Sequence, residues 1–277
     1  TAPWADDAQV EQDLVLSRAV VELFAAPGLA DKLALRGGTA LNKLFIEPAC
    51  RYSEDIDLVQ TQAGPIGEIL DAIRPRLDPW LGKPTRSRAE GGATLTYRFQ
   101  SEIAPVRPLR LKIEINTRKH FAVLGWQHRQ LALENPWFTG RAEVTTYELD
   151  ELLGTKLRAL YQRCKSRDLF DLWLCLSRKM LNPPRVIACF TEYLDRQGHS
   201  VSRAEFERNL HDKENAPAFL HDIRPLLRAD VQYDAQAAMQ AVREVLVEEL
   251  PGEPWRGPSG ASSPHAAPRA RRRKSAK

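Results

Sequence analysis

The sequence predicts an α+β protein, with strands concentrated in its first half and helices in its second. Segments 94–99 and 109–115 alternate apolar and polar residues, as strands with one solvated face do. Segment 33–35 is a short apolar stretch that also predicts a strand, and segment 55–58 predicts a strand that carries two aspartates. Beyond residue 145 the apolar positions recur at a period near 3.6, which indicates helices. The 277 residues, 43% of them hydrophobic, are enough for one large domain or two modest ones.

The helices are predicted from apolar spacing and from the proline and glycine residues at their ends. We expect Pro48 to end the second helix, and Pro79, Gly82 and Pro84 to form a turn after the third. The predicted helical ranges are 7–26, 39–45, 66–77, 149–164, a segment starting near Ser166, 184–197, 202–210 and 234–249.

We divide the chain into three regions. Residues 1–145 are predicted to form an α/β core, and residues 146–250 a helical domain that contributes to the active site. Residues 251–277 are rich in Pro, Gly, Ser and Ala and carry a run of arginines, a composition that cannot offset the entropy cost of ordering. We expect a disordered basic tail there, which either adds non-specific affinity for RNA or only solubilises the chain.

The charge distribution is uneven. The chain carries a formal net charge of +4, but residues 251–277 alone hold seven Lys or Arg and one Glu. In the body, residues 83–141 hold eleven Lys or Arg and four Glu, so a polyanionic partner would bind there. The alternative is an arginine-rich surface that is simply solvated.

Other sequence features indicate where in the cell the protein is located. No stretch approaches the roughly 18 apolar residues of a membrane span, and the first residues are acidic, unlike a secretory signal. We therefore expect a cytoplasmic protein with no membrane partner. The four cysteines contain no C-x-x-C pair, which predicts reduced, buried thiols; they are Cys50, Cys164, Cys175 and Cys189.

A glycine turn and a pair of aspartates carry the main chemical signal. Gly37, Gly38 and Thr39 follow a short strand and open a predicted helix. Without a Cβ in the way, backbone N–H groups there can approach a phosphate, and a helix start favours negative charge. Asp55 and Asp57 are two positions apart on a strand and share one face. Such carboxylates repel each other unless a cation lies between them, which predicts a Mg²⁺ site.

Two more charged residues extend this prediction. In the strand at 109–115, Arg110, Lys112 and Glu114 share the face opposite the apolar residues, so Glu114 is a third candidate carboxylate. The alternative is an ordinary solvated glutamate. Lys156 borders the apolar stripe of a predicted helix, so its stem packs on apolar surface while its ammonium reaches beyond it. The alternative there is a lysine that only reaches for solvent.

A pair of aspartates lies on the next predicted helix. Asp168 is in the first turn, where an acid interacts favourably with the helix dipole whatever the function. Asp171 lies three residues further on, where the dipole offers no such reason for its presence. We therefore treat Asp171 as a candidate site residue.

These segments together resemble the AbiEii/AbiGii-type nucleotidyltransferase toxins of abortive-infection and toxin–antitoxin systems, a group that includes the mycobacterial MenT-type toxins. The resemblance spans roughly residues 10–180, and the order and spacing of the segments make it specific. The segments are Arg36-Gly37-Gly38-Thr39-Ala40-Leu41, Arg51-Tyr52-Ser53-Glu54-Asp55-Ile56-Asp57-Leu58, Lys112-Ile113-Glu114-Ile115, Lys156-Leu157-Arg158-Ala159-Leu160 with Arg163, and Arg167-Asp168-Leu169-Phe170-Asp171.

The resemblance implies a polymerase-β-like nucleotidyltransferase fold, with a mixed β-sheet core and a helical C-terminal half. It implies an enzyme that transfers a nucleoside monophosphate (NMP) from a nucleoside triphosphate (NTP) and releases pyrophosphate. The expected acceptor is the 3′ end of tRNA, whose modification blocks translation, and a cognate antitoxin is the expected protein partner. The gap between Gly38 and Asp55 is longer than in many members of the wider superfamily, such as antibiotic adenylyltransferases, which are poorer matches.

The resemblance also implies roles for the catalytic residues. Asp55 and Asp57 would bind Mg²⁺, with Glu114 completing a second metal site. Lys156 would neutralise the charge that develops on the leaving pyrophosphate.

The remaining candidates concern the nucleotide. Gly38 and Thr39, with Gly37 before them, would hold the β- and γ-phosphates. Ser53 matches a family position that contacts the nucleotide phosphates. Asp171 would contact the nucleotide or orient Lys156. The weaker phosphate candidates are Arg36, Arg51 and Arg163.

Two other functions remain open at this point. The same chemistry could use a protein hydroxyl as acceptor, which is NMPylation. The chain could also be a non-catalytic RNA-binding or antitoxin-docking module that uses the basic segment 83–141 and the tail. Three carboxylates beside bound phosphates count against a binding module, because they would repel the phosphates.

Overall fold

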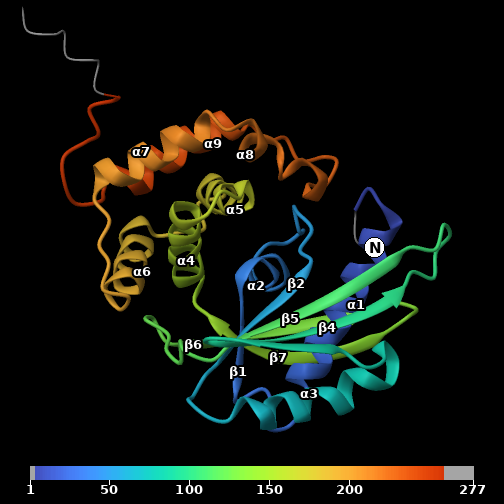
Figure 1. Ribbon diagram of the computed structural model, residues 1–277. Coiled ribbons are helices and arrows are strands. Elements are labelled where there is room, and N and C mark those ends of the chain that lie inside the picture. Colours follow the sequence, from blue (N-terminus) through green and yellow to red (C-terminus); the bar gives the residue numbers. More distant parts are fainter. Residues whose placement is uncertain (1–3, 259–277) are drawn as a thin grey trace, which may run out of the picture.

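The computed structural model describes residues 4–258, so the predicted tail lies largely outside the described residues. Within residues 4–258, seven strands form one mixed sheet in the order β3-β4-β5-β2-β1-β7-β6 (Figure 1). The strands are β1 (Leu33–Arg36), β2 (Asp55–Gln60), β3 (Thr85–Ala89), β4 (Gly92–Gln100), β5 (Pro108–Asn116), β6 (Trp126–Glu134) and β7 (Thr139–Tyr147).

The centre of the sheet positions the charged residues. Strand β2 is antiparallel to β1 and parallel to β5. In this register Asp55 lies opposite Lys112, and Asp57 lies opposite both Glu114 on β5 and Arg36 on β1. Residues opposite each other on neighbouring strands share a face, so the sheet collects these charges on one side.

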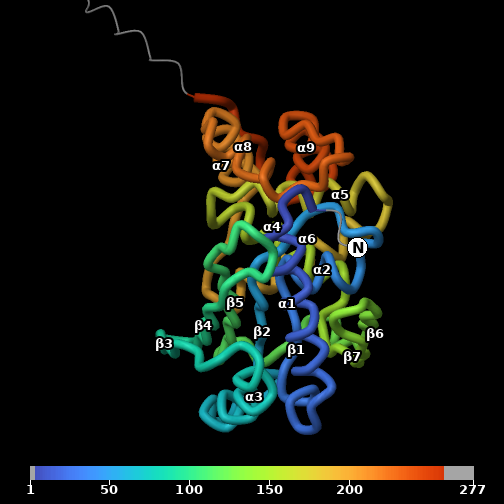
Figure 2. The backbone as a smooth tube through the Cα atoms, turned by 90° about the vertical axis from the view of Figure 1, so that its right-hand side faces the viewer, coloured from blue at the N-terminus to red at the C-terminus, as the bar shows by residue number. Residues whose placement is uncertain are grey.

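The helices form two groups. Helices α1 and α3 pack against the sheet and each other, whereas α4 to α9 form a separate helical half (Figures 1 and 2). Helix α2 starts directly after β1 and contacts both β2 and α4. The helices are α1 (Asp7–Phe24), α2 (Gly37–Leu44), α3 (Ile66–Leu81), α4 (Leu149–Gln162), α5 (Ser166–Ser177), α6 (Pro183–Asp195), α7 (Arg203–Glu214), α8 (Pro217–His221) and α9 (Ala235–Val242).

Each half has its own apolar core. One cluster joins the central strands to α1 and α3, and the other joins α4 to α9. Leu41 on α2 and Cys50 belong to the helical cluster, although they precede the second strand. This packing holds the glycine turn and the residues before the aspartates against the helical half. The division at residue 145 stays a prediction.

The predicted fold class is confirmed: a mixed sheet is followed by a helical C-terminal half. The alternation predicted for 109–115 is also present, with Leu111, Ile113 and Ile115 buried on one face. None of the helices in residues 4–258 is long and apolar enough to cross a membrane.

Several local predictions were wrong. Pro79 does not end a helix, because α3 continues to Leu81 and buries Leu77 and Leu81, so that packing outweighs the lost backbone hydrogen bond. The predicted helix at 234–249 is α9 followed by a π-helical turn at Arg243–Val247. Cys164 is exposed, unlike the other three cysteines.

Three strands were not predicted. The residues of β3, Thr-Arg-Ser-Arg-Ala, are all exposed, so the strand has no buried face to produce alternation. Strands β6 and β7 form an antiparallel pair at the opposite edge of the sheet, and much of β6 is exposed. Strands β3 and β6 lie at the two edges of the sheet, and edge strands carry weak sequence patterns because only part of one face is buried.

Candidate active site

A cleft of about 660 Å³ lies between the sheet and the helical half. Its walls come from the β1–α2 junction, β2, the β3–β4 turn, β5, α4 and the start of α5. Thr39 and Asp171 lie behind its wall, with no exposed surface. The other predicted site residues all line the cleft; they are Arg36, Gly37, Gly38, Arg51, Ser53, Asp55, Asp57, Glu114, Lys156 and Arg163.

Asp55 and Asp57 project from β2 into this cleft, while Ile56 and Leu58 are buried on the other face. Within the described part of the chain, neither carboxylate accepts a hydrogen bond, and Asp55 Oδ1 is buried without a partner. Burial and the adjacent charge of Asp57 raise the pKa of Asp55. Burial also raises the pKa of Asp57, against the opposing charge of Arg36. Cations of the protein therefore offset the charge of these carboxylates only in part, and none is bonded to them in residues 4–258.

Glu114 lies beside Asp57 in the strand register, but its carboxylate forms an ion pair with Lys112. Among residues 4–258, no three His, Cys, Asp or Glu side chains are arranged as a metal-binding group. Asp55 and Asp57 nevertheless fit a divalent cation, because both offer hard oxygen ligands that no protein donor occupies. Glu114 as a third ligand stays a prediction, and it requires release from Lys112.

The glycine turn packs directly on charged side chains. Gly37 has a φ of +71°, and a Cβ there would lie 2.2 Å from Asp57 Oδ2. A Cβ on Gly38 would lie 2.5 Å from Arg51 Nη2. Only glycine fits both positions, so the first turn of α2 can lie along the cleft wall. Backbone N–H groups in the first turn of a helix have no partner inside the helix and suit an anion.

The two predicted hydroxyl residues differ in position. Ser53 lines the cleft, and its Oγ lies 2.8 Å from Thr39 Oγ1. Thr39 is buried, and its hydroxyl donates to the backbone carbonyl of Asp55 at 2.5 Å. Thr39 thus ties α2 to the start of β2, and its contact with a nucleotide phosphate stays a prediction.

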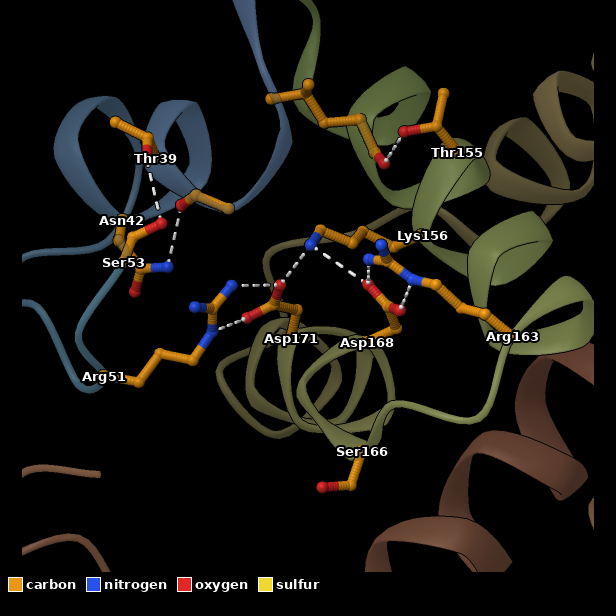
Figure 3. A network of polar contacts seen from close by, with 12 residues as sticks. Thr39, Asn42, Arg51, Ser53, Thr155, Lys156, Arg163, Ser166, Asp168 and Asp171 are labelled. Carbon is orange, nitrogen blue, oxygen red and sulfur yellow. Dashed lines mark hydrogen bonds and ion pairs between the residues drawn. The ribbon is translucent and has the colours of Figure 1, made fainter. Parts of the chain in front are cut away.

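A chain of ion pairs joins the segment before β2 to α4 and α5 (Figure 3). Arg51 donates from Nε and Nη2 to Asp171 at 2.6 and 2.8 Å. Lys156 Nζ lies 2.8 Å from Asp171 Oδ2 and 3.1 Å from Asp168 Oδ1. Arg163 donates to both oxygens of Asp168 at 2.7 and 2.9 Å. Lys156 is therefore buried between two carboxylates and does not simply reach for solvent.

These ion pairs determine the protonation states of Asp168 and Asp171. Burial acts to raise the pKa of Asp168, but Lys156 and Arg163 outweigh it and hold the pKa at about 2. For Asp171 the same opposition of burial against Arg51 and Lys156 leaves the pKa lowered. Both carboxylates therefore stay charged near neutral pH and keep Lys156 in a fixed position.

Sequence reasoning missed three charged residues here. Asp168 was interpreted only through the helix dipole, yet it binds Lys156 and Arg163. Arg158 and Arg167 also line the cleft. The spacing of Asp168 and Asp171, three residues apart on one helix face, was the available signal for a shared partner.

Comparison with known families identifies the family of this chain. The family model described as nucleotidyl transferase AbiEii toxin, type IV TA system, matches residues 18–243. The chain belongs to this family. It is therefore a nucleotidyltransferase of the AbiEii toxin family of type IV toxin–antitoxin systems, and the predicted resemblance is confirmed. Membership also implies an NTP donor and a cognate antitoxin.

Solved structures support the fold of this AbiEii-family chain. MenT4, a nucleotidyltransferase toxin from Mycobacterium tuberculosis, is similar with a TM-score of 0.61 and 16% identity, over 88% of this chain and 85% of that one. A putative nucleotidyltransferase from H. pylori is similar with a TM-score of 0.51 and 16% identity, over 87% of this chain and 93% of that one. The comparison with curated proteins found no match.

Proposed function

We propose that this AbiEii-family enzyme transfers an NMP from an NTP to the 3′ acceptor end of tRNA, in a Mg²⁺-dependent reaction that blocks translation in the cytoplasm. The observation that carries the proposal is the cleft itself. One wall presents Asp55 and Asp57 without protein partners, and the opposite wall presents Lys156 and Arg163. A triphosphate between these walls meets cations on one side and a metal-binding pair on the other.

Asp55 and Asp57 would hold Mg²⁺ in this scheme. When bound, Mg²⁺ would neutralise triphosphate charge and lower the pKa of the attacking hydroxyl. The chain supplies the rest of the chemistry. The first turn of α2, at Gly37 and Gly38, presents backbone N–H groups to the phosphates.

Lys156 is the residue that would act on the leaving group. Its ammonium has three N–H donors, and Asp168 and Asp171 take two of them. One donor remains for an oxygen of the pyrophosphate at the cleft that Lys156 lines. Because both carboxylates are themselves held by Arg51 and Arg163, the ammonium needs little reorganisation as charge develops.

Two arginines support a nucleic acid acceptor. Arg98 on β4 lies opposite Arg110 on β5, on the sheet face that carries Lys112 and the aspartates. Both arginines are exposed, and neither forms an ion pair in residues 4–258. Like charges opposite each other are unfavourable unless a partner compensates them. RNA phosphates leading toward the cleft would provide this compensation.

The test uses the purified chain with Mg²⁺, each of the four labelled NTPs in turn and a total tRNA pool. We expect one or more NTPs to label the 3′ end of tRNA, and Asp57→Ala to abolish the labelling. If no NTP labels any RNA, the proposed acceptor is wrong. Labelled protein in place of RNA would show NMPylation. RNA binding that depends on neither Mg²⁺ nor NTP would favour a binding module.

A further inference from the structure

Arg36 and Arg158 line the cleft, and a third cation, Lys119, lies beside Arg158. Arg36 is the last residue of β1, Lys119 follows β5, and Arg158 lies on α4. In the described part of the chain, none of the three forms an ion pair with Asp or Glu. We call these three residues the basic cluster.

Lys119 and Arg158 lie close together, because both contact the same two residues on α6 and just after it. Lys119 Nζ and the Arg158 guanidinium both lie over the ring of Tyr193, at 5.7 and 5.2 Å from its centre. With its amide oxygen turned toward them, Gln197 accepts hydrogen bonds from Lys119 Nζ and Arg158 Nη1, both at 3.0 Å. Tyr193 and Gln197 are both neutral, so these contacts supply neither cation with a counter-charge.

The charges in the basic cluster act on one another. Burial, Arg158 and Arg36 together lower the pKa of Lys119 to about 8. Burial and Arg36 lower the pKa of Arg158. Arg36 thus destabilises the charged forms of both Lys119 and Arg158, and Arg158 destabilises that of Lys119.

The carboxylates around the cluster are engaged elsewhere or lie only on its border. Both oxygens of Glu151 accept backbone N–H bonds, from Val123 and Leu124 at 2.8 Å, and one also accepts the Tyr193 hydroxyl at 2.8 Å. Asp57 faces Arg36 across the β1–β2 pair, so the cluster begins where the metal-binding pair ends. Among residues 4–258, no Asp or Glu forms an ion pair with Lys119 or Arg158.

The position of Arg158 is the strongest indication of a ligand. Its side chain is 7% exposed, lines the cleft, and has a buried Nε without a hydrogen-bond partner. A buried charge without a counter-charge is costly, and a fixed guanidinium offers paired donors to a phosphate. We propose that Arg36, Lys119 and Arg158 form a phosphate-binding subsite, separate from the Gly37–Gly38 turn.

Two substrates of the proposed reaction carry such phosphates. The subsite takes either the terminal phosphates of the NTP donor or a backbone phosphate of the RNA acceptor. Its place in the reaction rests on the proposed function, whereas the binding of phosphate does not.

The experiment measures binding by calorimetry without turnover. The variants are Lys119→Gln and Arg158→Gln in the full chain, and the probes are inorganic tripolyphosphate and a short RNA oligonucleotide. Exposed Lys179 and Arg76 lie outside the cleft, so Lys179→Gln and Arg76→Gln are the matched controls. We expect each cluster variant to weaken one probe at least about tenfold, the loss typical of a hydrogen bond to a charged group.

The pattern of losses identifies the source of the phosphate. Weaker tripolyphosphate binding alone assigns the subsite to the donor, weaker RNA binding alone assigns it to the acceptor, and weaker binding of both indicates a subsite that both use. Equal binding by cluster and control variants overturns the proposal. If the variants lose binding while the wild-type chain transfers no nucleotide, the subsite stands and the proposed function fails.

A second measurement covers the case in which Arg158→Gln folds poorly. Lys119 is only half-buried, so Lys119→Gln leaves the packing of α4 unchanged. We expect Lys119→Gln to leave the melting temperature of the phosphate-free chain unchanged or higher, because it removes repulsion. We also expect tripolyphosphate or the oligonucleotide to raise the melting temperature of the wild type more than that of Lys119→Gln. Equal shifts with both probes would contradict the proposal.

Discussion

Two pairs of aspartates lie at the same cleft. They differ in burial, in ion pairing and in the direction of their pKa shifts. Asp168 and Asp171 lie on α5, are fully buried, and bind Lys156, Arg163 and Arg51. Their pKa values are lowered. Asp55 and Asp57 lie on β2, accept no hydrogen bond within residues 4–258, and have raised pKa values.

The contrast separates structural carboxylates from ligand-binding ones. The α5 pair has its counter-charges within the chain, so it stabilises the fold and fixes Lys156. The β2 pair forms no ion pair within residues 4–258, and nearby cations offset its charge only in part, so its repulsion destabilises the folded chain until a cation binds. A half-buried carboxylate pair without ion pairs, beside a fully paired one, therefore indicates where a cationic ligand binds.

The largest expected effect is a loss of nucleotidyl transfer when the charge of one β2 aspartate is removed. Asp57→Asn keeps the shape of the side chain and removes its charge, so we expect nucleotidyl transfer to fall by at least about 10³-fold. Transfer from labelled NTP to the tRNA pool measures the effect, with unchanged circular dichroism as the control for folding. Near wild-type transfer by this variant would show that Asp57 does not bind the catalytic metal.

The second test removes a carboxylate from the α5 pair. Asp171→Asn leaves Arg51 and Lys156 without their shared counter-charge, so we expect a loss of about 3–5 kcal/mol in the free energy of unfolding. Urea unfolding followed by fluorescence measures it. The matched control is Asp212→Asn, an exposed aspartate on α7 that should change stability by less than about 0.5 kcal/mol. A similar small change at Asp171 would contradict a structural role.

The third test follows stability as the pH falls. The pKa of Asp168 is about 2 in the folded chain against an ordinary value of 3.8. A carboxyl with a lowered folded pKa contributes stability above its unfolded pKa, and this contribution is lost as pH falls through the folded value. We expect the wild type to lose about 2 kcal/mol more than Asp168→Asn between pH 5 and about pH 2. Parallel urea-unfolding curves for the two proteins would contradict this assignment.

Local patterns explain what the sequence alone could predict. Asp55, Asp57 and Glu114 were found because alternation along a strand determines which side chains share a face. The glycine turn was found because Gly37 and Gly38 follow a strand directly. These features depend on residues close together in the chain.

The unpredicted features depend on contacts between distant segments. Arg51 and Asp171 are 120 residues apart, and their pairing arises only when α5 packs beside the β2 segment. Lys119 and Arg158 come together through Tyr193 on α6, which no periodicity encodes. The ion pair of Lys112 with Glu114 also competes with the metal role that alternation indicated for Glu114.

The smallest expected effect is a gain in stability when the charge of Asp57 is removed. Its sign is opposite to that of the loss expected for Asp171→Asn. In a Mg²⁺-free buffer at pH 7, Asp57→Asn should raise the free energy of unfolding by on the order of 1 kcal/mol. Burial and neighbouring charge raise the folded pKa of Asp57, so its ionised form destabilises the folded chain at neutral pH. Added Mg²⁺ should then stabilise the wild type more than the variant. A lower stability for Asp57→Asn in chelator would show that the β2 aspartates are as structural as those on α5.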